Sequence, residues 1–345
     1  NYSIKKSQLD EIIKENVEFS LYYSWILVTV GKLDQAETFL TRAEQITKEN
    51  INDKKTLGKI YVVFAFLYSF SGRSEKILNY SKMAMENLSE DDLFWFSWGW
   101  HSKGTANMVN ENFLECYEDF KKALEYGKKT GNFFLISSTA MRVAYLEYRF
   151  GLLKLSYNRI SDLLKFIKEK GYSQMTKEEP SYTVLYSCLA AIESSWLNME
   201  DALENVKIAY KLSQKNPNLT YRAIVLVVYS FILYQKGNKE GCISKIKETE
   251  TILKSNKVIP NVLSLYISWR GFIYLDNDQL IEAAKFYKKY EINEQNKISY
   301  ADEHAYTSYC LYLIKTNKFD EAELLLSNLN KMAVAVNRVE RIVEL

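Results

Sequence analysis

One short pattern recurs along the chain about every forty residues. It consists of a turn residue, an apolar residue two positions later and a small residue five positions later, at the start of an amphipathic segment. Gly31-Lys32-Leu33-Asp34-Gln35-Ala36 is one copy, and Asn317-Lys318-Phe319-Asp320-Glu321-Ala322 is another. The turn positions of the eight copies are Gly31, Gly72, Glu111, Gly151, Leu197, Gly237, Asp278 and Asn317. Periods of roughly 34 to 47 residues are typical of helical-hairpin repeats.

The repeat predicts an all-α fold, a right-handed superhelical solenoid of about eight helical hairpins that are similar to tetratricopeptide repeats (TPR-like). One helix pair cannot bury its apolar face alone, so each hairpin must pack on its neighbours. The small residue of the pattern lets the two helices approach closely. Because a solenoid grows in one dimension, we expect a single repeat domain over residues 1–345.

Each period is interpreted as a first helix (A helix), a turn and a second helix (B helix). The A helices are expected near 18–30, 57–71, 93–109, 134–150, 181–196, 220–236, 261–275 and 301–316. The B helices are expected to begin near Leu33, Ser74, Phe113, Leu153, Met199, Lys239, Leu280 and Phe319. The A helices are apolar nearly all round, which suits helices that pack between neighbours. We expect them to line the concave face, with the B helices outside.

Composition supports long helices and argues against two classes of partner. Three prolines and twelve glycines in 345 residues leave few helix breakers. The 45 Lys and Arg residues nearly balance the 43 Asp and Glu residues, without a polybasic tract, so no nucleic-acid partner is expected for this region. The longest apolar stretches, such as residues 223–233, are too short to cross a bilayer, so no membrane partner is expected.

The sequence lacks the residue patterns of catalysis. The two histidines, His101 and His304, lie far apart, and the four cysteines are isolated, so no zinc pattern forms. No phosphate-binding loop, dinucleotide fingerprint or nucleophile elbow occurs. We therefore expect no enzyme, no catalytic or metal-binding residue and no cofactor. Single cysteines favour reduced, buried thiols and a cytoplasmic protein.

An aromatic cluster at residues 94–101 opens the third A helix. Packing between repeats is one explanation, because aromatic side chains dominate protein cores. The functional alternative is a stacking platform on the concave face. In that case Trp95, Trp98 and His101, spaced three residues apart, would face a ligand.

Charged residues inside the A helices are the second unusual feature, because a helix packed between neighbours has little reason to carry them. They are Arg142, Glu147, Arg149, Glu193, Arg222 and Arg270. They either pair within the solenoid or contact a ligand, and arginines would favour a carboxylate or another anion. The predicted ligand-binding residues are Trp95, Trp98, His101, Arg142, Tyr145, Arg149, Tyr182 and Arg222. A sugar, a nucleotide-like compound or a carboxylated metabolite would suit this set.

Residues 21–40 and 318–326 carry a resemblance to a known family. The chain resembles the TPR-like sensor domain of the MalT-type regulators, the large ATP-dependent LuxR-family transcription regulators, although Leu197 replaces the usual turn glycine. Residues 337–345 are similar to the stretch that precedes the DNA-binding domain there. The resemblance implies a fragment of a larger regulator, whose ATPase and helix-turn-helix domains lie outside this sequence. It also implies that a small-molecule inducer or a regulatory protein binds the concave face and that the other domains of the regulator are partners.

Two alternatives remain open at this stage. One is a peptide-pheromone receptor of the Rap/PlcR kind, which holds an extended peptide with asparagine side chains on its inner face. Asparagine is sparse in the predicted A helices, where Asn107 and Asn261 are the exceptions. The other alternative is a protein–protein scaffold, which needs no pocket.

Overall fold

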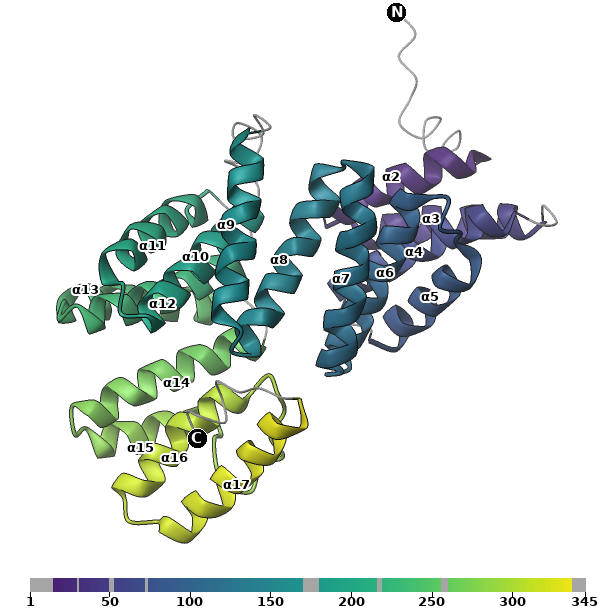
Figure 1. Ribbon diagram of the computed structural model, residues 1–345. Coiled ribbons are helices and arrows are strands. Elements are labelled where there is room, and N and C mark those ends of the chain that lie inside the picture. The colour runs from purple at the N-terminus through teal and green to yellow at the C-terminus, as the bar shows by residue number, and fades with distance from the viewer. Residues whose placement is uncertain are drawn as a thin grey trace, which may run out of the picture. The chain divides into compact units, whose positions relative to one another are not determined.

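The computed structural model describes residues 15–29, 31–49, 53–71, 74–169, 180–215, 219–255 and 260–336. These residues form sixteen α-helices and no strand (Figure 1). The A helices are α2 (Val17–Thr29), α4 (Lys54–Ser71), α6 (Leu93–Val109), α8 (Phe133–Arg149), α10 (Pro180–Ser195), α12 (Leu219–Gln235), α14 (Pro260–Asp276) and α16 (Glu303–Lys315). The B helices are α3 (Leu33–Glu49), α5 (Ser74–Asn87), α7 (Phe113–Thr130), α9 (Leu153–Glu169), α11 (Met199–Ser213), α13 (Lys239–Ser255), α15 (Leu280–Lys289) and α17 (Phe319–Ala335). The predicted all-α solenoid of eight hairpins is confirmed.

The chain forms two compact units, which divide within α8. Unit 1 comprises residues 1–143, and unit 2 comprises residues 144–345. The expectation of a single domain stays a prediction. Gly72 and residues 337–345, which the sequence patterns included, lie outside the described residues.

The turn between the two helices of a hairpin adopts one backbone conformation in every described copy. The residue at the turn position has a positive φ: Gly31 (78°), Glu111 (62°), Gly151 (74°), Leu197 (61°), Gly237 (76°), Asp278 (54°) and Asn317 (61°). Two backbone hydrogen bonds close the end of the A helix, as from Gly31 N to Val28 O (3.0 Å) and from Lys32 N to Leu27 O (2.8 Å). This is the Schellman cap, which satisfies the last carbonyls of a helix. The repeated turn residue is therefore a helix cap.

The small residue of the pattern lies in the helix interface. Ala36, Cys116, Ser156, Ala202, Cys242, Ala283 and Ala322 are each 2% exposed or less, and the larger Ile77 is fully buried. Ser24 and Ser156 each donate a hydrogen bond across their own hairpin, to the carbonyls of Ala36 (3.3 Å) and Ala144 (2.8 Å). Close packing also explains Gly104, since a Cβ there would lie 3.0 Å from the Phe120 ring. The register read from the sequence is the packing register.

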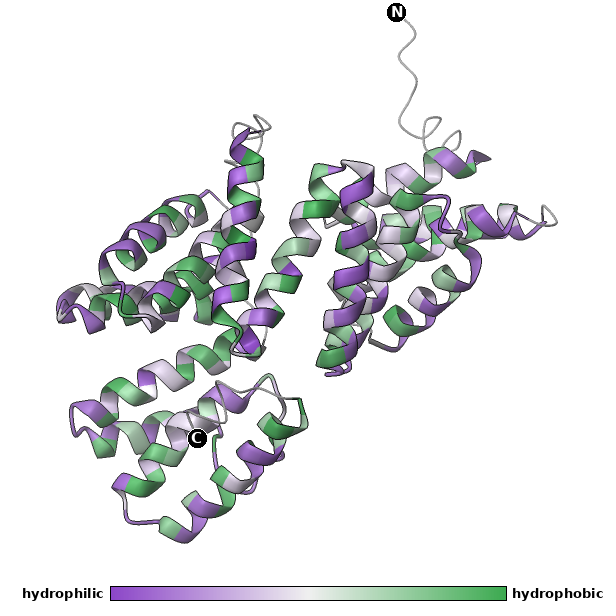
Figure 2. Ribbon diagram, viewed as in Figure 1, coloured by the Kyte–Doolittle hydropathy of each residue, from purple (hydrophilic) through white to green (hydrophobic). Residues whose placement is uncertain are grey.

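The A helices are more hydrophobic than the B helices and contribute more of the core. Figure 2 shows α12 as mostly hydrophobic, whereas α9 and α11 mix hydrophilic and hydrophobic residues along their length. The A helices supply most of the large core side chains, such as Phe64 and Trp98 in unit 1 and Ile232 and Leu313 in unit 2.

None of the helices in the described ranges is long and apolar enough to pass through a bilayer.

One B helix departs from the regular pattern. Helix α15 has 10 residues, whereas α13 and α17 have 17 each. It is capped by Glu291, whose φ is 56°, with the same pair of bonds as the hairpin turns: Glu291 N to Lys288 O (3.1 Å) and Ile292 N to Tyr287 O (3.0 Å). An irregular connection then leads to α16. The seventh repeat therefore has a truncated outer helix.

Leu197 provides a test of the cap. Replacing Leu197 by glycine should stabilise the fold by about 0.5–1 kcal/mol, because relief of the left-handed strain exceeds the entropy that glycine adds to the unfolded chain. Leu197 is 78% exposed, so little apolar burial is lost. Urea denaturation measures the change. The matched control is Leu324→Gly in the middle of α17, where the same replacement should cost about 1 kcal/mol. Equal destabilisation by both variants would contradict the cap.

Candidate functional site

The predicted binding residues of unit 1 form part of its core. Trp95 and Trp98 are 3% and 1% exposed, and both pack edge-on against Trp25 of α2, with ring centroids 5.8 and 4.8 Å away. The imidazole of His101 lies 4.8 Å from the Trp98 ring and 5.1 Å from the Phe120 ring. These contacts join the first and third hairpins, which is the packing role considered for the cluster.

His101 is held neutral by its surroundings. Burial lowers the pKa of His101 to about 3, and the positive charge of Arg142 contributes in the same direction. Within the described part of the chain, the buried Nε2 of His101 and Nε1 of Trp98 have no hydrogen-bond partner. The Nη1 atom of Arg142 lies 3.6 Å from the Sδ of Met108, a weak acceptor. Arg142 therefore keeps most of its donor capacity.

In unit 2, Tyr145 and Arg149 connect hairpins that are distant in sequence. The Nη2 of Arg149 donates to Glu303 Oε1 at 2.9 Å, and its Nη1 lies 3.3 Å from His304 Nε2. The side chains of Arg149 and Glu303 are 11% and 2% exposed. Asn261 donates to the hydroxyl of Tyr145 at 3.3 Å. The end of α8 is thus tied to the starts of α14 and α16.

Two of the charged A-helix residues are paired within their own hairpins. Glu147 is fully buried and accepts two bonds from Arg159 of α9, at 2.8 and 2.6 Å. Glu193 accepts a bond from Asn205 of α11 at 2.8 Å, and burial raises its pKa. Both pairs span twelve positions, the distance across one hairpin turn. These carboxylates stabilise hairpins and are not free for a ligand.

The remaining predicted residues lie elsewhere in unit 2. Tyr182 is 8% exposed, and its ring centroid lies 6.4 Å from that of Tyr186. Arg222 is partly exposed, and its Nη2 lies 3.9 Å from Glu248 Oε2. Its Nε is buried without a hydrogen-bond partner among the described residues. Arg222, like Arg142 in unit 1, therefore retains donors that a ligand could use.

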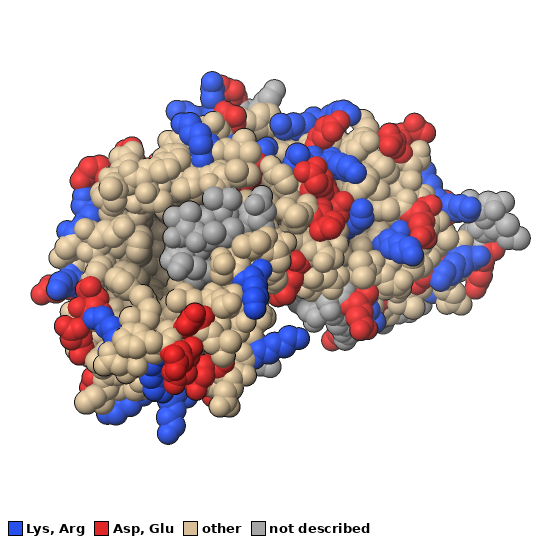
Figure 3. All heavy atoms as spheres, turned by 60° about the horizontal axis from the view of Figure 1, so that its bottom comes forward, with Lys and Arg blue, Asp and Glu red and all other residues tan. Residues whose placement is uncertain are grey.

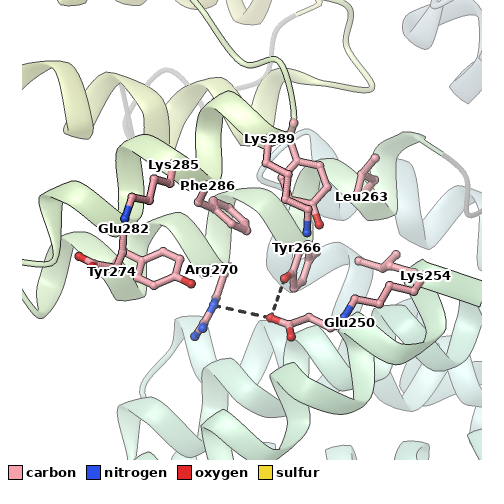
Figure 4. A pocket seen from close by; sticks show the side chains of 12 residues that line it. Glu250, Lys254, Leu263, Tyr266, Arg270, Tyr274, Glu282, Lys285, Phe286 and Lys289 are labelled. Atoms are coloured by element: carbon pink, nitrogen blue, oxygen red, sulfur yellow. Dashed lines mark hydrogen bonds and ion pairs between the residues drawn. The ribbon is translucent and has the colours of Figure 1, made fainter.

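A groove opens in unit 2 between two B helices. Its volume is about 850 Å³, and α13 and α15 form its walls while α14 forms its floor (Figure 4). The lining residues are Glu250, Leu253, Lys254, Leu263, Tyr266, Arg270, Tyr274, Glu282, Lys285, Phe286, Lys289 and Tyr290. It lies on the B-helix side of the hairpins, whereas the predicted site lies on the A helices.

Inside the groove, the Glu250 carboxylate of the α13 wall lies beside the Arg270 guanidinium of the α14 floor. The hydroxyl of Tyr266 donates to Glu250 Oε1 at 2.8 Å, and Arg270 Nε lies 3.8 Å from the same oxygen. Burial and the bond to Glu250 raise the pKa of Tyr266, which keeps the phenol protonated. The Arg270 guanidinium lies 4.4 Å from the centre of the Tyr274 ring, within cation–π distance.

Sequence reasoning identified Arg270 as an unusual charge but did not predict the groove. The lysines come from α13 and α15, where solvent-facing lysines are ordinary. The polar run Asn293-Glu294-Gln295-Asn296 was the available signal that α15 ends early. On the face shown in Figure 3, basic and acidic side chains are interspersed. No cluster of three or more potential metal ligands occurs among the described residues.

Comparisons with known proteins define the fold class. No family model matches the chain. A Rap protein complexed with competence and sporulation factor is similar over 96% of this chain and 94% of that chain, with a TM-score of 0.69 and 14% identity. The apo form of the quorum sensor NprR from B. thuringiensis is similar over 92% and 87%, with a TM-score of 0.61 and 12% identity.

A third similar structure is a Signal Transduction ATPase with Numerous Domains (STAND) protein with a tetratricopeptide repeat sensor, from Pyrococcus horikoshii. It matches 92% of this chain but only 45% of that chain, with a TM-score of 0.58 and 17% identity. At these identities the likeness shows the fold. The chain is a TPR-like helical-repeat solenoid.

The neutral state of His101 predicts a pH dependence of stability. The imidazole of His101 has a pKa of 6.5 in the unfolded chain and of about 3 in the folded protein. As the pH falls below 6.5, the unfolded state therefore binds a proton that the folded state does not, and the free energy of unfolding decreases. His101→Gln should therefore lose about 2 kcal/mol less stability than the wild type between pH 7 and pH 5. Urea denaturation at both pH values measures this. Phe120→Leu is the control, because it loosens the same packing while His101 remains, and it should keep the wild-type pH dependence.

The buried pair of Arg149 and Glu303 predicts strong coupling across unit 2. Arg149→Met should cost about 3–5 kcal/mol, because it leaves the Glu303 carboxylate buried without its guanidinium. Adding Glu303→Leu should recover part of that loss. A double-mutant cycle measured by urea denaturation gives the coupling energy. Additive losses would show that the two side chains do not stabilise each other.

Proposed function

We propose that this chain is a signal-sensing helical-repeat domain, which binds a peptide or a small-molecule signal on its A-helix surface. The observation that carries the proposal is the full-length likeness to a Rap protein complexed with competence and sporulation factor. NprR, a quorum sensor, and the tetratricopeptide repeat sensor of the STAND protein share the architecture. A solenoid presents an extended surface that suits such ligands.

The proposed site residues remain those predicted from the sequence, and we propose different roles for them. Arg142 of unit 1 and Arg222 of unit 2 each retain donors and partial exposure, so each is proposed as the principal ligand contact within its own unit. Trp95, Trp98 and His101 would act by shaping the core behind such a site. Arg149 and Tyr145 would hold the hairpins of unit 2 in register for binding.

The experiment is a ligand screen followed by matched variants. Short linear peptides and metabolite anions are screened by the rise in Tm that binding produces. A hit is then titrated calorimetrically against Arg142→Gln and Arg222→Gln, with Arg42→Gln on the outer helix α3 as the control. Loss of a charge-assisted contact should weaken binding about tenfold in at least one test variant and leave the control unchanged. Equal affinity in all three variants would contradict the site.

A second proposal concerns the protein around this domain. The STAND protein is matched over less than half its length, which favours a sensor within a larger ATPase. We propose the MalT-type regulator as that context, with a Rap-like receptor as the competing one. The coding sequence on either side of this region tests it. An upstream ATPase and a downstream helix-turn-helix would support the regulator, and their absence would contradict it.

A further inference from the structure

We propose that the groove between α13, α14 and α15 is a separate binding site for a small organic anion that has an aromatic or aliphatic body. The acidic group would be a carboxylate or a phosphate. The site does not depend on the proposed sensing surface, because its two walls are B helices. None of the four cationic residues that line it is among the ligand-binding residues proposed for that surface.

Size and lining fit such a ligand. The volume of about 850 Å³ falls within the range of roughly 300–1,000 Å³ that is usual for small-molecule sites. Phe286 is 9% exposed, and its ring centroid lies 5.5 Å from that of Tyr274 and 6.0 Å from that of Tyr266. Partly buried Leu253 and Leu263 extend this apolar surface. An aromatic or aliphatic body would replace water against these side chains.

The charges around the groove select an anion. Four cationic side chains line it (Lys254, Arg270, Lys285 and Lys289) against two carboxylates, Glu250 and Glu282. Within the described ranges, the three lysines make no ion pair, although Lys289 Nζ lies 5.1 Å from the centre of the Tyr290 ring. Glu250 is already engaged by Tyr266 and Arg270. The uncompensated charge of the lining is therefore positive.

Arg270 is positioned to bind the acidic group. Figure 4 shows it between Tyr274 and Glu250, with its Nε linked to the carboxylate. The guanidinium lies over the Tyr274 ring, 4.4 Å from its centre, and this cation–π contact favours that position of the side chain. Its two Nη groups make no hydrogen bond to any described residue, so they can donate in parallel to two oxygens of a carboxylate or a phosphate. The lysines would add charge at the rim.

The probe is anilinonaphthalene sulfonate, a fluorescent organic anion with an aromatic body, titrated into the intact chain. Arg270→Gln should raise its dissociation constant about tenfold, because a charge-assisted contact is lost. Lys285→Glu should raise it about fivefold or more by reversing a rim charge. The matched control is Lys247→Glu, which makes the same charge reversal on an exposed face of α13 outside the groove, and it should bind like the wild type.

Competition identifies the acidic group. Phenylpropionate and phenyl phosphate should each be tested for displacement of the dye, with neutral phenylpropanol as the comparison. Displacement by the carboxylate, by the phosphate or by both, at concentrations where the alcohol has no effect, supports the proposal and names the group.

Two results would overturn the proposal. One is displacement by the alcohol as effective as by either anion. The other is a Lys285→Glu variant whose affinity equals that of Lys247→Glu, and this comparison still decides the matter if Arg270→Gln fails to fold. Neither result bears on the sensing surface, since Arg142 and Arg222 lie outside the groove.

Discussion

The structure depends on the capped turn between the two helices of each hairpin. In the seven hairpins whose turn is described, one residue with a positive φ ends the A helix. The residue five positions after the turn position is buried, and it is small in seven of the eight copies, which lets the B helix pack closely. Since a hairpin cannot bury its apolar faces alone and must pack on other hairpins, the geometry of each turn also affects the packing between hairpins. The chain tolerates Gly, Glu, Leu, Asp and Asn at the turn because the requirement is a backbone conformation, and no side-chain contact is needed there.

This explains how much of the fold was predictable. All eight B helices begin at the residues that the repeat predicted, from Leu33 to Phe319. The period of the repeat is kept although the residue types vary from copy to copy. The register could therefore be predicted even where Leu197 replaces glycine. The early end of α15 could not be read this way. Glu291 caps it in the left-handed conformation, yet a glutamate in that place is equally typical of an exposed helical position.

The candidate sites were less predictable, because their contacts join residues that are far apart in the sequence. Pairs across one hairpin, such as Glu147 with Arg159, follow from the fixed geometry of the turn. Arg149 and Glu303 are 154 positions apart, and their contact depends on curvature accumulated over four repeats. The groove depends on the spacing of α13 and α15 and on which side chains are left without partners. The period of the repeat predicts neither the spacing of these helices nor the pairing of their side chains.

The contact of Arg149 with Glu303 has a consequence for how unit 2 loses structure. A linear array of repeats can fray from either end, because each repeat is held only by its neighbours. In unit 2 the C-terminal end of α8 is hydrogen-bonded to the start of α16, the last A helix, so the last hairpin cannot detach without breaking a buried ion pair. Amide hydrogen exchange in α16 should therefore follow that of α8, and the unit should open as one cooperative body.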